Sequence, residues 1–532
     1  MKSECRYLDY RSTALFSSLV LDYLDQHPAL EPFIEHAPTL DGMRSAMEAR
    51  KKFPTHRALI RSTFEQAYAG QSTAEQARNI ELLSAETTFT VCTAHQPNIF
   101  TGYLYFIYKT AHTIALCRSL KAAFPKNDFV PVFYIGSEDN DLDELSVFQL
   151  NGKPFRWETD QTGAVGRMQS DAGIQQLIEE IRKEVSHFPY AQQLIDLLKK
   201  AYAKGNTMAD AIFILLNEMF GAEGLLVLQP DDAALKQSFV AVMKDDLVHS
   251  RAERIVGQSI EALSRQYKVQ VNPRTVNLFY LRDGIRNRID KRGEQYSVDG
   301  TVIRFQQSEI LQELKEHPER FSPNVILRGL YQETILPNIA FIGGGSEVAY
   351  WMELRSLFEH YGVPYPVLVL RNSFLVVDAA HWSKLEALGI HEADLFKDET
   401  IVANEVIQRW AAADIHLSKE TAESRALFEH LKQRAGAIDR TLVQHVHALE
   451  VGFLKRMESL EKKMLRAERK KQSTQLQRIW KLKSALFPQG SLQERKWNVL
   501  PYYAQYGPAF IHTILRHSLA LEQQFGIVII EE

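Results

Sequence analysis

Hydrophobic residues recur at helical spacing through the first 85 residues, around Leu15, Leu19 and Tyr23 and again over 59–68. This predicts a mostly helical N-terminal segment. From Thr88 onward, short β-rich runs alternate with helical stretches. The runs cover residues 89–93, 130–135, 225–228, 339–342 and 367–370, and the helical stretches cover 103–120, 208–220, 233–246 and 347–361. The alternation predicts an α/β core in which helices flank a mostly parallel sheet.

Residues 269–305 follow a different pattern, in which short β-like runs are separated by Arg282-Asp283-Gly284 and Asp299-Gly300. Closely spaced strands joined by Asp-Gly turns are typical of hairpins. We therefore expect a small antiparallel insert within the core.

Beyond Leu388 the β-like signal nearly vanishes and a long helical seam replaces it. Its apolar residues recur at spacings of three or four, or sums of these: Leu427, Leu431, Ala435, Ile438, Leu442, Leu449, Phe453, Met457, Leu460 and Met464. Gly436, with Asp439 as a new N-cap, is the candidate point at which the seam divides into two helices. A helix of about 40 residues would be ~60 Å long, so we expect a projecting arm that packs against its own chain or a second subunit.

Composition narrows the class of protein. At 532 residues and 45% hydrophobic content, the chain can form two or three domains around a sizeable core. The net charge of −4 gives no whole-chain argument for a nucleic-acid or membrane partner. Cys5, Cys92 and Cys117 are widely spaced, which indicates neither a disulfide framework nor a zinc site and fits a reducing cytoplasm. No signal peptide is expected at the N-terminus.

Polar residues collect where the predicted strands end. The first group follows the run at 89–93: His95, Gln96, Asn98, Thr101, Gly102 and Lys109. A glycine turn before a helix can offer backbone N–H groups to an anion, so these residues are candidates for nucleotide binding. The alternative is an ordinary turn with a surface histidine. No GxxxxGK[ST] motif occurs, which excludes a Walker-type phosphate loop.

An acidic loop follows the run at 130–135, and we select Glu138, Asp139 and Asp141 from it as catalytic candidates. Crowded carboxylates are tolerated best beside a cation or a cationic ligand. They can bind Mg²⁺, receive an ammonium group or act as a general base. The alternative for any one acid is a helix cap or a solvated loop.

Two further clusters supply candidate ligand contacts. The carboxylate-binding and stacking candidates are Asn324, Arg328, Glu347, Tyr350, Trp351 and Arg371, and the anion-cradle candidates are Gly343 and Gly344. Arginine suits bidentate contact with carboxylate or phosphate, and aromatic rings can stack on a base or sugar. Salt bridges and core packing are the alternatives for these residues.

Residues 455–483 carry 11 basic side chains against three acids. Because these charges accompany an apolar seam, we interpret them as the solvated flank of a coiled coil and not as a nucleic-acid site.

Long motifs occur in order along the chain: HQPNIFTGYLYFIYK (95–109), EDNDLDE (138–144), FSPNVILR (321–328), GGGSEVAYW (343–351), VLVLRNS (367–373) and LFPQGSLQER (486–495). Together they resemble the BshC family, the cysteine-adding ligases of bacillithiol biosynthesis, over the full length. The resemblance implies a Rossmann-like core similar to class I aminoacyl-tRNA synthetases, and addition of L-cysteine to the amine of glucosaminyl malate. ATP or ADP is the expected nucleotide and Mg²⁺ is a candidate.

The expected organisation is a Rossmann-like core over residues 1–390 with the insert at 269–305, a coiled-coil arm over 391–487, and a C-terminal segment over 488–532 that packs back on the core. We expect a cytoplasmic homodimer joined through the arm, with no nucleic-acid or membrane partner. Two rival hypotheses remain at this stage. One is another synthetase-like nucleotidyl transferase or aminoacyl ligase, and the other is a non-catalytic dimeric adaptor that binds RNA.

Overall fold

A five-stranded parallel sheet forms the centre of the protein. The computed structural model describes residues 1–410 and 416–531. The sheet order is β13-β12-β2-β3-β6, with every neighbouring pair parallel. The bounds are β2 Thr88–His95, β3 Asp128–Ile135, β6 Leu226–Leu228, β12 Asn338–Gly343 and β13 Val367–Leu370. The strand order reverses between β2 and β12, as in doubly wound folds, and this confirms the predicted Rossmann-like α/β core.

Helices cover both faces of this sheet, so its strands are apolar and buried almost throughout. The helices that connect or precede the strands are α5 Tyr105–Ala123, α9 Met208–Phe220, α14 Val325–Ile335 and α15 Gly345–Tyr361. Each parallel crossover returns the chain to the same end of the sheet. The carboxyl ends of all five strands therefore meet at one edge.

The N-terminal segment contains the predicted helices, which are α1 Ser18–Leu24, α2 Leu40–Lys51, α3 Arg57–Ala67 and α4 Ala74–Leu82. It begins, however, with a strand that the pattern did not predict, β1 Lys2–Leu8. This strand pairs antiparallel with β15 Phe525–Glu531, which also pairs with β14 Phe374–Asp378. The C-terminal strand thus lies in the middle of a second sheet, between the two others.

Two insertions interrupt the core. Between β3 and β6 lie α6 Leu142–Leu145, the hairpin β4 Val147–Leu150 and β5 Lys153–Arg156, α7 Ala172–Val185 and α8 Ala191–Ala201. Between β6 and α14 lie α10 Ala233–Gln237, α11 Val240–His249, α12 Arg251–Leu263, β7 Leu278–Arg282, β8 Ile285–Arg292, β9 Gln295–Val298, β10 Arg304–Gln306, α13 Gln307–Glu316 and β11 Phe321–Pro323. Strands β7 to β11 form an antiparallel sheet.

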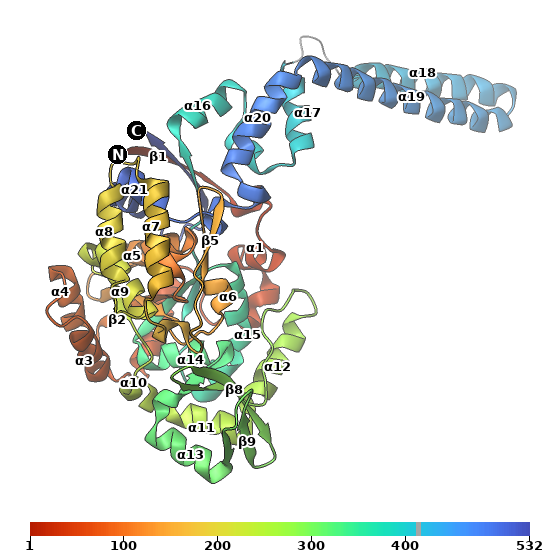
Figure 1. Cartoon of the computed structure of the whole chain (residues 1–532). Helices are drawn as coiled ribbons and strands as arrows, with labels where there is room; N and C mark the ends of the chain where they lie inside the picture. The colour runs from red at the N-terminus through yellow and green to blue at the C-terminus, as the bar shows by residue number, and fades with distance from the viewer. Residues whose placement is uncertain (411–415, 532) are drawn as a thin grey trace.

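The predicted coiled coil is confirmed as a helical hairpin that projects from the body (Figure 1). Its long helices are α18 Ser418–Ile438 and α19 Thr441–Lys471. The chain reverses at Asp439, whose carboxylate accepts hydrogen bonds from the backbone N–H and the hydroxyl of Thr441. At the base lie α16 Ala379–Ala387, α17 Glu399–Trp410 and α20 Ser473–Leu486, and the chain then returns through α21 Leu500–Tyr506 and α22 Pro508–His517.

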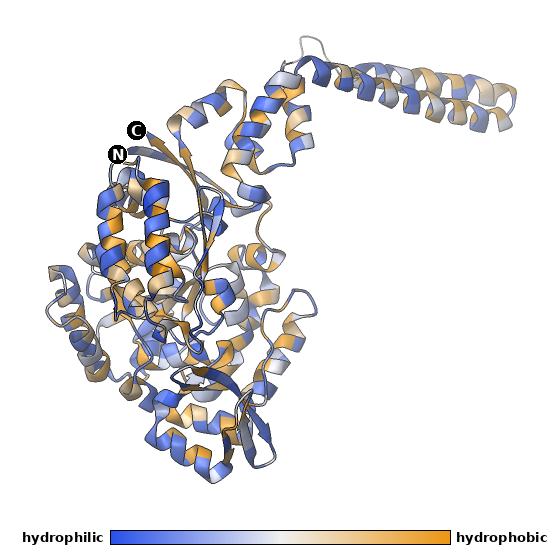
Figure 2. Ribbon diagram, viewed as in Figure 1, coloured by the Kyte–Doolittle hydropathy of each residue, from blue (hydrophilic) through white to orange (hydrophobic). Residues whose placement is uncertain are grey.

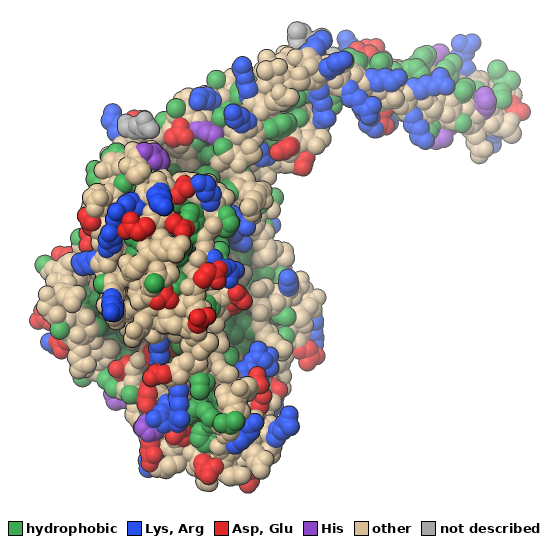
Figure 3. All heavy atoms as spheres, in the orientation of Figure 1, with side chains coloured by type: hydrophobic (Ala, Val, Ile, Leu, Met, Phe, Trp, Pro, Cys, Tyr) green, Lys and Arg blue, Asp and Glu red, His purple; other side chains and the backbone are tan. Residues whose placement is uncertain are grey.

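The apolar seam of the arm thus finds a partner in its own chain. The rings of Phe428 and Phe453 pack 5.7 Å apart, and Lys432 forms an ion pair with Glu450 at 2.6 Å. The pairing is incomplete, because seam residues such as Ile438 remain 82% exposed. Figure 2 shows hydrophobic and hydrophilic residues interspersed along both helices, and Figure 3 shows Lys and Arg side chains spread along the arm.

Within residues 1–410 and 416–531, no helix is both long enough and apolar enough to cross a membrane.

One buried histidine connects three separate parts of the chain. In α5, Nδ1 of His112 accepts a hydrogen bond from the backbone N–H of Asn372, and its Nε2 lies 2.7 Å from the carbonyl oxygen of Ala520. The first contact requires an unprotonated Nδ1, so the ring is neutral with its proton on Nε2. Burial accordingly lowers the pKa of His112 to about 4.

We predict that His112 makes stability depend on pH. In the unfolded chain the imidazole titrates near its ordinary pKa of about 6.5, so protons favour unfolding once the pH falls below that value. Between pH 7.5 and pH 5 the loss should be about 2 kcal/mol. Replacing His112 by Gln should remove this part of the pH dependence in thermal unfolding. An equal pH dependence in wild type and His112→Gln would contradict the prediction, and His249→Gln, at an exposed position, is the control.

Candidate active site

A cavity of about 650 Å³ lies at the carboxyl edge of the parallel sheet. Residues that follow each of the five strands line it, including Gln96 after β2, Glu138 after β3, Pro230 after β6, Gly344 after β12 and Arg371 after β13. Ligands of open α/β sheets bind at this edge, beside the point where the strand order reverses. The cavity is therefore the candidate active site.

The predicted residues divide into two sets by position. Those that line the cavity are His95, Gln96, Glu138, Asp139, Asn324, Arg328, Gly344, Glu347, Tyr350 and Arg371. Those outside its lining are Asn98, Thr101, Gly102, Lys109, Asp141, Gly343 and Trp351. The cavity thus brings together most of the predicted residues, and they come from five separate motifs.

His95 lies at the end of β2 against the edges of the Tyr105 and Phe106 rings. Burial lowers its pKa well below the ordinary value, and the nearby cations Lys109, Arg371 and Arg328 lower it further. The imidazole is therefore neutral. Its Nε2 is buried and has no hydrogen-bond partner among the described residues, which leaves this atom available to a bound ligand.

The acidic loop is held in place by a neighbouring turn of the chain. The backbone N–H groups of Val165 and Gly166 donate to the carbonyl oxygens of Asp139 and Ser137, at 2.7 and 2.9 Å. A Cβ at Gly166 would lie 2.3 Å from the Ser137 carbonyl oxygen, so only glycine allows this approach. The loop backbone is thereby fixed on the cavity side.

The acids of this loop have different environments. Glu138 is buried and forms an ion pair with Lys236. Asp139 is half-buried and accepts a hydrogen bond from Nε2 of Gln96 at 3.1 Å. Asp141 is exposed and caps α6 by accepting from the N–H of Glu144, so it is a helix cap outside the cavity and not a catalytic contact.

Arg328 presents a positive charge to the cavity with no acidic partner among the described residues. One nitrogen donates to the Tyr350 hydroxyl at 2.6 Å, and the guanidinium lies 5.7 Å from the centre of the Tyr134 ring. The other terminal nitrogen, Nη1, is buried without a hydrogen-bond partner in the described chain. A guanidinium in this state is prepared to bind an anionic ligand.

The other predicted cations are already paired. Arg371 forms two hydrogen bonds with the Glu494 carboxylate, at 2.8 and 3.0 Å. Lys109 is buried and contacts Glu347 at 2.8 Å and the Ala94 carbonyl oxygen at 2.6 Å. Both residues therefore support the cavity wall, and the expectation that Arg371 is free to hold a substrate carboxylate is corrected.

The glycine-rich segment also differs from its prediction. The N–H of Gly344 donates to the carboxylate of Glu347 at 2.8 Å, so this side chain occupies the start of the helix. Gly343 is the last residue of β12. Trp351 is fully buried and stacks on Phe341 at 4.4 Å in the hydrophobic core, not on the cavity wall.

The predicted nucleotide turn is a strained structural turn. Phe100, Thr101 and Gly102 have φ values of 50°, 67° and 65°, a conformation that non-glycine residues rarely adopt. The side chain of Asn498 stabilises the turn by donating to the carbonyl oxygens of Phe100 and Gly102. Asn98 and Thr101 are buried in this turn, outside the cavity lining.

The sequence analysis missed several residues of the site. Arg286, from β8 of the insert, lines the cavity; its Nη1 donates to Asn140 and its Nε to Ser322. Tyr105 also lines the cavity, and Lys236 forms an ion pair with Glu138 from outside the lining. No local signal marked Arg286, because only the fold brings the insert to the strand ends.

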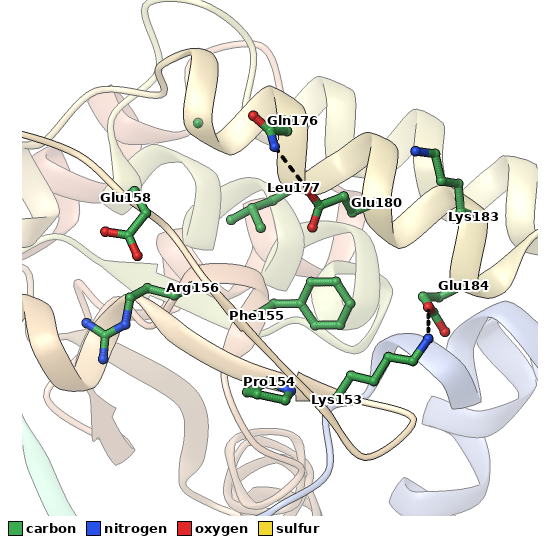
Figure 4. A pocket seen from close by; sticks show the side chains of 11 residues that line it. Lys153, Pro154, Phe155, Arg156, Glu158, Gln176, Leu177, Glu180, Lys183 and Glu184 are labelled. Carbon is green, nitrogen blue, oxygen red and sulfur yellow. Dashed lines mark hydrogen bonds and ion pairs between the residues drawn. The ribbon is translucent and has the colours of Figure 1, made fainter.

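A second groove lies away from these strand ends, between β5 and α7 (Figure 4). Among its charged side chains, Lys153 and Glu184 form an ion pair at 2.5 Å. It contains none of the predicted site residues. No group of three or more His, Cys, Asp or Glu side chains that could hold a metal occurs within residues 1–410 and 416–531.

Comparison with known proteins identifies relatives along the whole chain. A family model described as Bacillithiol biosynthesis BshC, N-terminal Rossmann-like domain matches residues 1–372, and one described as the BshC C-terminal coiled-coil domain matches residues 374–530. Proteins named "Putative cysteine ligase BshC" from Flavobacterium johnsoniae and Christiangramia forsetii are each 37% identical, over 100% and 99% of both chains. Arginyl-tRNA synthetase of Thermus thermophilus matches at 11% identity over 84% of this chain and 86% of its own, with a TM-score of 0.21, too low to support an argument.

We predict that Arg328→Gln weakens the binding of small anions in the cavity by about tenfold or more, because hydrogen bonds to charged groups contribute about 1.5–3 kcal/mol. Calorimetric titration with succinate and with inorganic phosphate measures the effect. Arg265→Gln, at an exposed position, is the control. Equal affinities in wild type and Arg328→Gln would show that the unpaired guanidinium does not bind anions.

Proposed function

The chain belongs to the BshC family of bacillithiol biosynthesis, and from this premise we propose that it is a ligase that joins L-cysteine to the amine of glucosaminyl malate. The product of this reaction is bacillithiol. The observation that carries the proposal is the composition of the strand-end cavity. The carboxylates of Glu138 and Asp139 line it together with Arg328, whose Nη1 has no hydrogen-bond partner among the described residues. Carboxylates suit an amine, and the guanidinium suits the malyl carboxylates.

The proposed reaction requires activation of the cysteine carboxylate. A free carboxylate does not form an amide with an amine in water, so we propose that ATP converts it into an adenylate or an acyl phosphate. The amine nitrogen then attacks the carbonyl carbon, the bond to AMP or phosphate breaks, and the amide remains. The cavity suits such ligands because it contains buried polar atoms without partners in the described chain, namely Nε2 of His95, Oγ of Ser137 and Nη1 of Arg328.

We assign roles to the cavity residues on this basis. His95 and Gln96 contact the nucleotide or the activated carboxyl group, and Glu138 and Asp139 receive the amine. Arg328 and Arg286 hold the malyl carboxylates, with Arg286 in place of the paired Arg371. Mg²⁺, where the reaction uses it, would enter with the nucleotide phosphates near Asp139, since Mg²⁺ is commonly held by one or two carboxylates together with substrate phosphates.

We also propose that the protein is a homodimer joined through the arm. After α18 and α19 pair with each other, seam residues on both remain exposed, including Leu427 at 57%, Leu449 at 53% and Leu460 at 47%. A row of apolar side chains on a projecting hairpin is typical of a protein interface. A second copy offers the same row and can cover it symmetrically.

We predict that His95→Ala and Asp139→Asn each reduce bacillithiol formation by about 100-fold or more, the scale of general acid–base and positioning effects. Mass spectrometry of the product from purified enzyme, L-cysteine, glucosaminyl malate and ATP measures the rate. Asp143→Asn changes an exposed acid of the same loop outside the cavity lining and should retain activity. Full activity in both His95→Ala and Asp139→Asn would refute the site assignment, and replacing the acceptor by other amines tests the substrate.

We predict that the double variant Leu449→Glu, Leu460→Glu is a monomer in light scattering, whereas the wild type is a dimer. Introduced carboxylates would be buried without partners at the interface. Gln444→Glu adds a charge at an exposed polar position of the same helix and serves as the control. A monomeric wild type, or a double variant that stays dimeric, would argue against the arm as the interface.

A further inference from the structure

Four charged side chains alternate in sign between the cavity wall and the half-buried Arg167: Glu138, Lys236, Asp231 and Arg167. The ammonium group of Lys236 donates to Oε1 of Glu138, to Oδ1 of Asp231 at 3.4 Å and to the carbonyl oxygen of Glu319 at 3.1 Å. Arg167 holds the same aspartate with two hydrogen bonds, at 2.6 and 2.8 Å. The series carries no net charge, and one end of it faces the cavity.

Lys236 lies too deep to contact a ligand itself. Its side chain is 1% exposed and it does not line the cavity, whereas Glu138 does. A lysine ammonium has three protons to donate, and Glu138, Asp231 and the Glu319 carbonyl oxygen supply three acceptors. These contacts fix Lys236, a residue of α10, relative to Asp231, Glu319 and the acidic loop.

Glu138 is held on one side only. Its Oε1 is bound by Lys236, whereas Oε2 makes no hydrogen bond within the described residues. The backbone on both sides is fixed, because the carbonyl oxygens of Ser137 and Asp139 accept from Gly166 and Val165. The carboxylate therefore keeps one oxygen tied and one oxygen free on the cavity side.

We propose that Lys236 is a positioning residue for Glu138, which it holds so that Oε2 accepts a proton from the amine of the substrate. This inference rests on the proposed ligase function. The amine arrives as an ammonium, passes one proton to Oε2, and attacks the activated carbonyl carbon through its freed electron pair. The second proton leaves with the departing phosphate or AMP, and Glu138 returns its proton to water.

The charges around Glu138 support this assignment. Burial raises the pKa of Glu138, while Lys236 opposes the rise and Asp231 adds to it. Arg286, on the insert, is the other cation that favours the ionised form. Removing Lys236 would leave Asp231 close to a buried carboxyl group, so Glu138 would take up a proton at higher pH.

The first test is the pH profile of product formation. In Lys236→Met the acid limb should move up by about one pH unit or more, and Lys236→Arg, which keeps the charge, should restore it. Lys244→Met, at an exposed position, should leave the profile unchanged. An acid limb that does not move in Lys236→Met overturns the proposal.

A double variant addresses loss of folding. Lys236→Met combined with Glu138→Gln removes both charges of the pair, so it should fold even if Lys236→Met alone does not. If Lys236 acts through Glu138, the double variant is as active as Glu138→Gln alone. A further drop of tenfold or more would show that Lys236 acts in another way and would overturn the proposal.

A direct titration separates this inference from the function on which it rests. In protein labelled with ¹³C at the glutamate carboxyl groups, the signal absent from Glu138→Gln should titrate at higher pH in Lys236→Met than in wild type. A shift of this signal together with a wild type that forms no bacillithiol would refute the ligase function and retain the Lys236 to Glu138 coupling. An unshifted signal would refute the coupling whatever the activity.

Discussion

The cost of burying charge determines how this cavity is built. Moving an ion out of water costs several kcal/mol unless a partner compensates it. Several ionisable side chains in and behind the cavity walls are buried. Most are neutralised in pairs: Lys109 with Glu347, Arg371 with Glu494, and Lys236 with Glu138. Arg328 instead has a tyrosine hydroxyl and an aromatic ring as its neighbours. The groups that lack an ionic partner are thus the ones left to a ligand.

The same constraint links distant parts of the chain to the sheet. Glu494 belongs to the segment that follows the arm, yet it is fully buried against Arg371 at the end of β13. Asn498, four residues later, supports the strained turn after β2. The C-terminal segment therefore completes the walls that the parallel strands begin.

Local patterns in the sequence were enough to predict the core and much of the cavity. The apolar runs identified the five parallel strands, and because their carboxyl ends meet at one edge, His95 and Glu138 could be grouped in advance. The individual roles were harder to predict. Arg371 and Lys109 have acidic partners that lie 123 and 238 residues away along the chain. Trp351 has a large apolar ring and one polar N–H group, so its residue type suits either a hydrophobic core or a ligand site. Strand β1 depends on a partner at the opposite end of the chain, so no periodicity near residue 2 could reveal it.

The position of β15 has a consequence for how the protein is made. It lies between β1 and β14, so Lys2 cannot pair with Glu531 until residues 525–531 have been synthesised. During translation, β1 stays without its partner strand while more than 500 residues are synthesised. The central sheet can form earlier, because all five of its strands precede Arg371. A ribosome that stops early releases a protein that lacks β15 and, when it stops before residue 494, also the carboxylate that neutralises Arg371. The cavity walls are therefore complete only after the segment that follows the arm has been made, and the edges of β1 and β14 stay unpaired until β15 joins them.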